Sequence, residues 1–369
     1  MVDALTYALA SLDVQALTSL SRLVDVYTPI VFPVIALALY LGYPKVRRNR
    51  LRVCAFFLGL ALVAALVFFV KYSNEVPRPC AEFPSLSKLG YCPPDYSFPS
   101  LHAAFAFVFA GASLGTTFFP LFLLLSLMVA FTRVYAGAHM IGDVVGGAAI
   151  ALAAYFAVET LLREHFPAIV PPNERRKVER RKDGGLALEV MRNAVHAGFG
   201  SAVVLAALSF GVAWTETLLF SALVLGMVSM HYRMRGIPQP ALDWLFDLLE
   251  RPRVIPAKGA FMYAFGVLLA LSFLPAPEAL AVIAVLAWGD SAATVAGKAL
   301  GGPEWPHNRG KSVAGSAAFA VFGALAAYPL AGPVAVPLAL ACALVETIGL
   351  GIDDNLLIPV AGIMFFALA

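Results

Sequence analysis

The stretch LRVCAFFLGLALVAALVFFV, residues 51–70, decides the fold class of this chain. Its only charged side chain is Arg52, close to its start. A helix needs about 20 predominantly apolar residues to cross a bilayer, because its backbone must satisfy every hydrogen bond internally. We therefore expect a membrane-spanning helix at residues 52–70.

The same apolar pattern recurs along the whole chain. The chain has 369 residues, of which 60% are hydrophobic and 13% are charged, whereas charged residues make up about 25% of soluble chains. We predict an all-α polytopic membrane protein with about 12 transmembrane helices. The predicted spans lie at residues 27–43, 52–70, 101–117, 118–136, 140–162, 190–213, 215–232, 259–275, 278–298, 313–330, 332–350 and 355–369. Residues 3–20 are weakly apolar and fit either a surface helix or a further span.

A charged segment separates two predicted helical-bundle domains. The sequence NERRKVERRKDGG at residues 173–185 is a charge run that ends in two glycines, as is typical of a linker. We therefore divide the chain into a domain at 1–162, a cytoplasmic linker at 163–185 and a second domain at 186–369. We interpret the basic cluster as a solvated segment that orients the protein, and we expect no nucleic-acid partner.

Basic residues near the ends of the spans predict the orientation, because cytoplasmic loops are enriched in Lys and Arg. The loop 44–52 carries five of them: Lys45, Arg47, Arg48, Arg50 and Arg52. Counting spans from this loop places residues 72–100 outside, and the linker and the loop 301–312 inside. We expect the protein in the plasma membrane of a prokaryote, archaea included.

Polar clusters interrupt the spans on the predicted outer side. They comprise Lys71, Arg78, Ser100, His102, Arg133, His139 and Asp143. Ionisable side chains within spans are costly, about 2.5–3.5 kcal/mol at a helix centre, so they indicate a functional site. The two arginines and the lysine suit a phosphoryl group.

The two histidines indicate the chemistry of this site. One can act as a nucleophile and the other as a general acid. Asp143 follows His139 by four residues, so both lie on one helix face and the carboxylate can orient the imidazole. The helix that starts after Ser100 would also direct free backbone N–H groups at a phosphate.

The clusters resemble the type 2 phosphatidic acid phosphatase superfamily. The matching stretches are KYSNEVPRP (71–79), PSLH (99–102) and TRVYAGAHMIGD (132–143). Leu101 replaces the family's glycine, and Thr132 replaces its serine.

The resemblance implies a phosphohistidine mechanism without a metal or other cofactor. His139 would attack phosphorus, Asp143 would orient it, and His102 would protonate the leaving oxygen. The side chains implied to bind the phosphoryl oxygens are those of Lys71, Arg78, Ser100 and Arg133.

Cys80 and Cys92 share the predicted outer loop. An oxidising exterior permits a disulfide between them, although two free thiols are the alternative.

The second domain carries its own polar groups, centred on residues 288–316, WGDSAATVAGKALGGPEWPHNRGKSVAGS. The residues that suit a nucleotide are Asp290, Ala293, Gly297, Gly301, Lys311, Ser312 and Gly315. Glu346, Asp353, Asp354 and Asn355 supply oxygen ligands suited to Mg²⁺ at a span boundary, and we expect Asp290, Asp353 and Asp354 to hold the ion. Further polar residues of this domain are Glu189, Arg192, His196 and Glu346. Ordinary tight helix packing would also explain the small residues.

This domain resembles the CTP-dependent polyprenol kinase family, which includes dolichol kinase and phytol kinase. Gly310 and Ala314 depart from the family's Lys and Glu, and Asn193 replaces a Lys. The resemblance implies γ-phosphoryl transfer from CTP, with Mg²⁺, to a lipid alcohol.

Together the two domains predict an enzyme that replenishes a polyprenyl (dolichyl-type) phosphate carrier. The phosphatase would act on the diphosphate and the kinase on the free alcohol, so that both yield the monophosphate. Alternatives are a phosphatidate or isoprenoid phosphate phosphatase joined to a diacylglycerol or geranylgeraniol/phytol kinase, a live phosphatase with an inactive kinase domain, and a lipid transporter with vestigial motifs.

Overall fold

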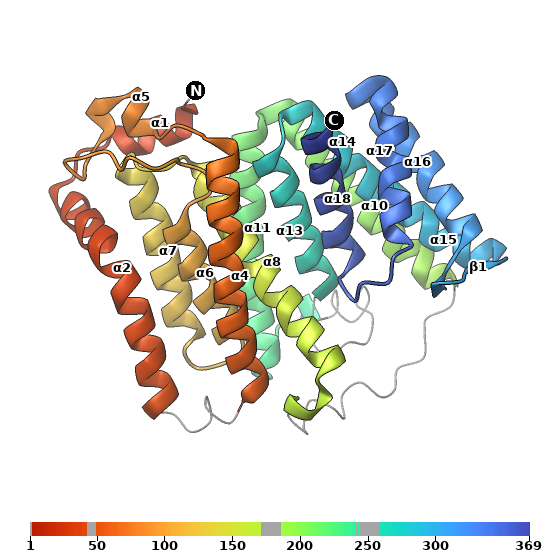
Figure 1. Cartoon of the computed structure of the whole chain (residues 1–369), viewed down its shortest axis with the longest axis horizontal. Helices are drawn as coiled ribbons and strands as arrows, with labels where there is room; N and C mark the ends of the chain where they lie inside the picture. The colour runs from red at the N-terminus through yellow and green to blue at the C-terminus, as the bar shows by residue number, and fades with distance from the viewer. Residues whose placement is uncertain (1, 43–48, 171–185, 241, 244–257) are drawn as a thin grey trace. The chain divides into compact units, whose positions relative to one another are not determined.

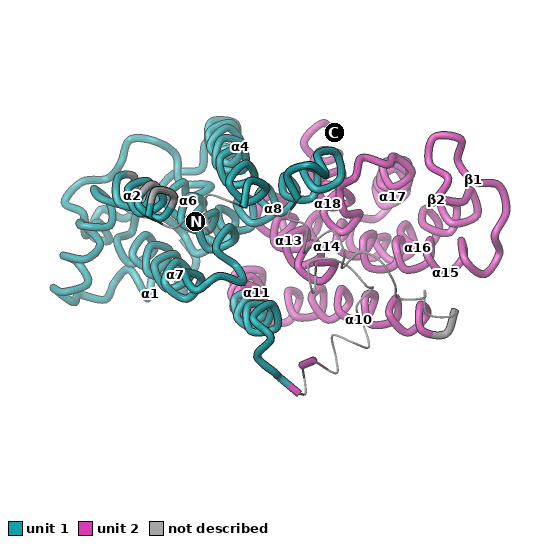
Figure 2. The backbone as a smooth tube through the Cα atoms, turned by 90° about the horizontal axis from the view of Figure 1, so that it is seen from below, with its two compact units in different colours: residues 1–176, 224–239 teal, residues 177–223, 240–369 magenta. Residues whose placement is uncertain are grey.

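The computed structural model describes residues 2–42, 49–170, 186–240, 242–243 and 258–369. Most of the linker predicted at 163–185 lies outside the described residues, as do Lys45, Arg47 and Arg48 of the basic loop. The chain divides into two compact units, coloured separately in Figure 2. The first unit comprises residues 1–176 and 224–239, and the second comprises residues 177–223 and 240–369.

The first unit is a helical bundle. Its elements are α1 (Ala4–Ser11), α2 (Gln15–Gly42), α4 (Arg50–Asn74), α5 (Pro79–Glu82), the 3₁₀ turn η1 (Pro84–Leu86), α6 (Leu101–Ser113), α7 (Phe119–Tyr135), α8 (Ile141–His165), the 3₁₀ turn η2 (Pro167–Ile169) and residues 224–234 of α11 (Val212–Met234). Helices α4, α6 and α8 pack against one another, and α7 packs against α6 (Figure 1). Phe32, Phe109 and Phe122 bring α2, α6 and α7 together in an apolar core.

Glycines allow α8 to lie close to its neighbours. A Cβ on Gly147 would come 2.6 Å from the backbone oxygen of Ser100, so a larger residue would push α8 away from the start of α6. This approach lets the Ser100 N–H donate to the Asp143 backbone oxygen at 3.0 Å. The close packing therefore holds together the two helix starts that carry polar motif residues.

The second unit is also helical. Its elements are α10 (Leu186–Phe210), residues 212–223 of α11, α13 (Lys258–Phe273), α14 (Ala276–Ala284), the π-helical segment η4 (Val285–Asp290), α15 (Ser291–Leu300), β1 (Glu304–Trp305), β2 (Asn308–Ser312), α16 (Val313–Ala331), the 3₁₀ turn η5 (Gly332–Val334), α17 (Ala335–Glu346) and α18 (Asp354–Leu368). Helix α16 packs against α14, α15 and α17, and α13 packs against α18. The two strands form an antiparallel hairpin.

The predicted class, an all-α polytopic membrane protein, is confirmed. Among the described residues, six helical stretches are long and apolar enough to cross a membrane, or seven if the bent helix α2 counts as one. The prediction of about 12 spans also counted shorter apolar helices. One of these is α6, whose 13 residues reach only about 20 Å of the roughly 30 Å apolar layer.

Two features differ from the sequence interpretation. The loop predicted at 301–312 contains the β1–β2 hairpin. The span predicted at 278–298 runs through α14, η4 and α15, with the π-helical segment ending at Asp290.

Residues 224–239 group with the first unit, where His231 stacks on Phe119 at 4.7 Å between ring centroids.

Candidate functional sites

The polar motif residues of the first unit meet at one end of its bundle. Lys71 lies in the last turn of α4 and Arg133 in the last turn of α7. His102 lies in the first turn of α6, and Asp143 in the first turn of α8. These helices alternate in direction, so segments far apart in the sequence converge around His139, which precedes α8.

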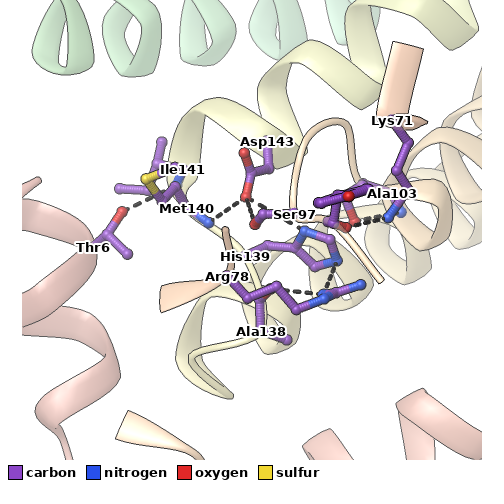
Figure 3. A network of polar contacts seen from close by, with 12 residues as sticks. Thr6, Lys71, Arg78, Ser97, Ala103, Ala138, His139, Met140, Ile141 and Asp143 are labelled. Atoms are coloured by element: carbon purple, nitrogen blue, oxygen red, sulfur yellow. Dashed lines mark hydrogen bonds and ion pairs between the residues drawn. The ribbon is translucent and has the colours of Figure 1, made fainter. Parts of the chain in front are cut away.

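His139 is held between a carboxylate and a guanidinium, as Figure 3 shows. Its Nδ1 lies 3.4 Å from Oδ2 of Asp143, and its Nε2 lies 3.1 Å from Nη1 of Arg78. An arginine can only donate. Nε2 therefore carries the lone pair and Nδ1 carries the proton, a tautomer assigned from these partners.

Asp143 is fixed in turn by two donors. Its Oδ2 accepts from the Met140 backbone N–H at 2.7 Å and from the Ser97 hydroxyl. Ser97 and Asp143 are both buried. Ser97 was not predicted as a site residue, and a lone serine ahead of the Pro-Ser motif carries no sequence signal for this contact.

Burial governs the protonation of His139. Desolvation lowers its pKa well below the usual histidine value, and the positive charge of Arg78 lowers it further, as do those of Arg133, Lys71 and His102. The ring is therefore neutral at neutral pH, as a nitrogen nucleophile requires. The same interactions show that the structure brings these five predicted residues within electrostatic reach of one another.

Lys71 and Arg78 share a carboxylate that the motifs do not include. Asp95 lies in the loop between η1 and α6. Its Oδ2 lies 3.0 Å from the Lys71 Nζ, and its Oδ1 lies 2.6 Å from the Arg78 Nη2. Burial alone would raise the pKa of Asp95, but the hydrogen bond from Lys71 and the charge of Arg78 lower it below the usual value. Asp95 is therefore an ionised counterion to both side chains.

Arg133 has a separate counterion from outside the motifs. The Asp25 carboxylate on α2 lies 2.7 Å from its Nη1, and it also accepts from the Tyr91 hydroxyl at 2.5 Å. The backbone oxygen of Asp25 lies 3.4 Å from Nε2 of His102. Helix α2 thus supports both a phosphate-binding candidate and the general-acid candidate.

Two other predicted features have defined structural roles. The Ser100 hydroxyl caps α6 by accepting from the Ala103 N–H at 3.5 Å. Cys80 and Cys92 form a disulfide, with their Cα atoms 5.7 Å apart. This bond closes the loop just before Asp95.

The second unit gathers a lysine and three carboxylates. Nζ of Lys311 on β2 donates to Oδ2 of Asp354 at 2.8 Å and to Glu346. Ligand oxygens of Asp290, Glu346 and Asp354 lie within 4.8 Å of one another. Burial alone would lower the pKa of Lys311, but the charges of Asp354 and Glu346 raise it above the usual value, so the lysine is a cation.

The donor set of this cluster fits Mg²⁺. It offers carboxylate oxygens, which hard divalent cations prefer, and Glu346 Oε2 is buried without a hydrogen-bond partner among the described residues. The cluster brings together Asp290 and Asp354, two of the residues predicted to hold the ion, with Glu346, which the sequence also offered as an oxygen ligand. Asp353, the third residue predicted to hold the ion, accepts from the Asn355 N–H and caps α18.

Two polar residues on α10 connect to the segments near this cluster. Nε2 of His196 lies 3.7 Å from Oδ2 of Asp290. Glu189 pairs with Lys298 at 2.9 Å and with Arg192 at 3.8 Å. The contact of His196 with Asp290 joins α10 to η4, and that of Glu189 with Lys298 joins α10 to α15.

The small residues predicted to bind a nucleotide pack helices closely. A Cβ on Gly315 would lie 3.0 Å from the Ala293 backbone oxygen, and one on Gly297 would lie 3.2 Å from the Ser312 hydroxyl. Ser312 caps α16 by accepting from the Gly315 N–H at 3.1 Å. Gly301 ends α15 with a φ of +62°.

Comparison with known proteins finds a family match for part of the first unit. Residues 52–166 match the PAP2 superfamily. No curated protein and no solved structure matches the chain. The matched segment runs from α4 to α8 and contains every predicted phosphatase residue, so it supports a lipid phosphatase activity. Asp25 lies outside it.

Proposed function

We propose that the PAP2 superfamily domain hydrolyses a polyprenyl (dolichyl-type) diphosphate to the monophosphate, with His139 as the nucleophile. The observation that carries the proposal is the placement of the neutral His139 ring between Asp143 and Arg78, with Lys71, Arg133 and His102 within electrostatic reach. This set contains a nucleophile, an orienting carboxylate, an acid and three cations.

The first chemical step follows from the tautomer. The lone pair on Nε2 of His139 attacks the terminal phosphorus, and the phosphorus–oxygen bond to the leaving polyprenyl phosphate breaks. His102 gives its proton to the leaving oxygen. Asp143 accepts from Nδ1 and stabilises the positive charge that develops on the ring. Lys71, Arg78 and Arg133 stabilise the charge on the phosphoryl oxygens.

In the second step a water attacks the phosphohistidine. The phosphorus–nitrogen bond breaks, His102 takes the proton of the water, and inorganic phosphate leaves. Before attack, Arg78 must give up its contact with Nε2 and turn to the phosphoryl oxygens. Its Nη1 also donates to the Ala138 backbone oxygen at 2.7 Å, so the guanidinium stays anchored beside the nucleophile during this change.

The direct test is hydrolysis by the purified full-length protein with three substrates: a polyprenyl diphosphate, the matching monophosphate and phosphatidate. We expect the diphosphate to be preferred and the monophosphate to accumulate, and we expect His139→Ala to abolish turnover. Accumulation of the free polyprenol as the main product would refute the diphosphate assignment, and activity in His139→Ala would refute the mechanism.

The second unit has a specific observation in favour of CTP-dependent phosphorylation of a lipid alcohol. The Lys311 ammonium meets carboxylates from α17 and α18, next to Asp290. Asp290, Glu346 and Asp354 would hold Mg²⁺, which supplies charge neutralisation on nucleotide phosphates. Lys311 would bind a phosphate oxygen in exchange for one of its carboxylates.

Transfer of ³²P from CTP or ATP to dolichol, geranylgeraniol and diacylglycerol tests this activity, with Asp290→Asn as the control. Labelling of a lipid from CTP that is lost in Asp290→Asn is the expected result. Absence of labelling with every alcohol would favour a live phosphatase joined to an inactive kinase unit, or a transporter.

The two proposed activities are compatible because they share a product. A phosphatase acting on monophosphates would undo the work of the kinase, whereas one acting on diphosphates makes the same carrier phosphate. The proposal also requires the two sites to face opposite sides of the membrane. Labelling of Pro94→Cys and Glu304→Cys in intact cells tests this, and equal accessibility of both cysteines from outside would refute it.

A further inference from the structure

The phosphate-binding side chains of the first unit hold a carboxylate in a way that resembles a bound phosphate. Lys71 and Arg78 each contact a different oxygen of the Asp95 carboxylate, at 3.0 Å and 2.6 Å. Oxyanions with two oxygens on one centre are what such a pair recognises. Both cations are therefore already paired with an anion of the protein itself, the Asp95 carboxylate.

The three side chains differ in how firmly they are held. Lys71 and Arg78 are 3% and 6% exposed, whereas the Asp95 side chain is 37% exposed. The carboxylate is therefore the partner with room to move into solvent, and the two cations are fixed in the protein.

Backbone groups keep the cations in place without the carboxylate. Nζ of Lys71 also donates to the Tyr96 backbone oxygen at 2.6 Å, and Nε of Arg78 donates to the Asp95 backbone oxygen at 2.9 Å. The loop that supplies these oxygens follows the Cys80–Cys92 disulfide. Rotation of the Asp95 side chain would vacate the anion position and leave both cations aimed at it.

Charge prevents the carboxylate and a phosphate from sharing this position. Asp95 is ionised, because Lys71 and Arg78 outweigh the effect of its burial. A phosphate next to it would place like charges within a few ångströms, which is unfavourable. Binding of phosphate and contact of Asp95 with the cations therefore exclude one another.

We propose that Asp95 is an exchangeable internal anion that occupies the phosphate subsite and weakens the affinity of this site for phosphate. The inference rests on the proposed function for the identity of the ligand class. When only a fraction of the molecules has a free site, the apparent dissociation constant rises in inverse proportion to that fraction. Asp95 thus sets this constant for the product inorganic phosphate.

The consequence is selection for substrates held in the bilayer. A lipid anchored in the membrane presents its headgroup at a high effective concentration, and so displaces the carboxylate even from a weakened site. Free inorganic phosphate has no such advantage and leaves. Asp95 is therefore a specificity-determining residue that limits product inhibition.

The test measures binding of inorganic phosphate to the full-length protein by calorimetry, which needs no turnover. Asp95→Asn keeps the shape of the side chain and removes its charge. We expect its dissociation constant to be about tenfold lower than that of the wild type, which corresponds to about 1.4 kcal/mol. Asp95→Glu restores a carboxylate and should return the weaker affinity.

A matched control is Asp13→Asn. Asp13 is 86% exposed, and its contact is a 4.0 Å pair with Lys88, so we expect unchanged phosphate binding. Asp95→Ser serves as a second charge-removing variant if Asp95→Asn does not fold. A structural role for Asp95, in which it merely aligns the cations, predicts the opposite result for both variants: weaker phosphate binding.

Unchanged or weaker binding of phosphate in the charge-removing variants would overturn the inference. Kinetics give a second readout: the KM for the lipid and the inhibition constant for phosphate should fall together, with kcat unchanged or lower. If phosphate binds more tightly in Asp95→Asn while no polyprenyl diphosphate is hydrolysed, the inference stands and the proposed substrate is wrong.

Discussion

Replacing Asp25 by asparagine removes the counterion of the most deeply buried arginine of the first site. The Arg133 side chain is 1% exposed, and its partner carboxylate on α2 lies 2.7 Å away and is 10% exposed. The substitution leaves the guanidinium charged, buried and without its ion pair. Removing one partner of a buried pair costs about 3–5 kcal/mol. We expect Asp25→Asn to lower the free energy of unfolding by an amount near this range.

The same substitution should reduce catalysis, because the Asp25 carboxylate holds Arg133 in position, whereas the backbone oxygen that contacts His102 is unchanged. A displaced Arg133 would lose its charged hydrogen bond to the phosphoryl group of the substrate. Such a bond is worth about 1.5–3 kcal/mol, or roughly 10–150-fold in kcat/KM. The assays are thermal unfolding in detergent and hydrolysis of the polyprenyl diphosphate.

A double-mutant cycle isolates the ion pair from other effects of the substitution. Arg133→Met should be destabilising alone, and Asp25→Asn combined with it should cost less than the sum of the two single changes. Additive effects on stability would show that the two side chains do not interact, and would refute the assignment of Asp25 as the counterion.

Four further predictions concern the two sites and the disulfide. Asp143→Asn should lower kcat by roughly 10²–10⁴-fold, measured by single-turnover hydrolysis, and an unchanged rate would exclude it as the orienting group. Because burial and neighbouring cations lower the pKa of His139, kcat/KM should hold as the pH falls through about 6.5. In the same pH range the free energy of unfolding should decline, because the histidine binds a proton in the unfolded chain but stays neutral in the native protein. A pH–rate profile and unfolding scans check both effects, and an acid limb with an apparent pKa of about 6.5 or higher would contradict them. Lys311→Met leaves the Glu346 carboxylate beside other carboxylates without a cation, so the variant should unfold at a lower temperature in buffer without Mg²⁺. Added Mg²⁺ should restore the unfolding temperature of the variant. An equal loss in both buffers would argue against a metal site. Cys80→Ser removes the disulfide and should lower the free energy of unfolding by about 2–4 kcal/mol, which is measured as a lower unfolding temperature. A reductant should lower the unfolding temperature of the wild type by the same amount and should have no further effect on the variant.

The helices were predictable from the sequence because length and apolarity are local properties. The span predicted at 52–70 lies within α4, and the one predicted at 140–162 nearly coincides with α8. The spacing of the phosphatase motifs likewise placed Lys71 and His139 in one site, since each lies beside a helix end.

The counterions were not predictable in this way. Asp25 and Asp95 are single acidic residues without a repeated spacing to the cations that they contact. Their roles depend on how α2 and the loop before α6 fold over the site, which is a tertiary property. No local pattern indicates that a given aspartate will face a given arginine.

The capping position of Asp353 had a recognisable signal in the sequence. Asp353 precedes the apolar run that forms α18, and aspartate is among the preferred residues for capping the start of a helix. Its side chain accepts from the Asn355 backbone N–H and from the Asn355 side-chain amide. Glu346, at the end of α17, and Asp354 are the carboxylates that contact Lys311.

The π-helical turn η4 determines which way Asp290 faces. Such a turn holds more residues than an ordinary α-helical turn, so every residue after it is rotated about the helix axis relative to a regular helix. Successive α-helical residues are about 100° apart around the axis. Removing one residue from η4 would therefore rotate Asp290 about the helix axis and away from Glu346 and Asp354, although all three carboxylates would still be present.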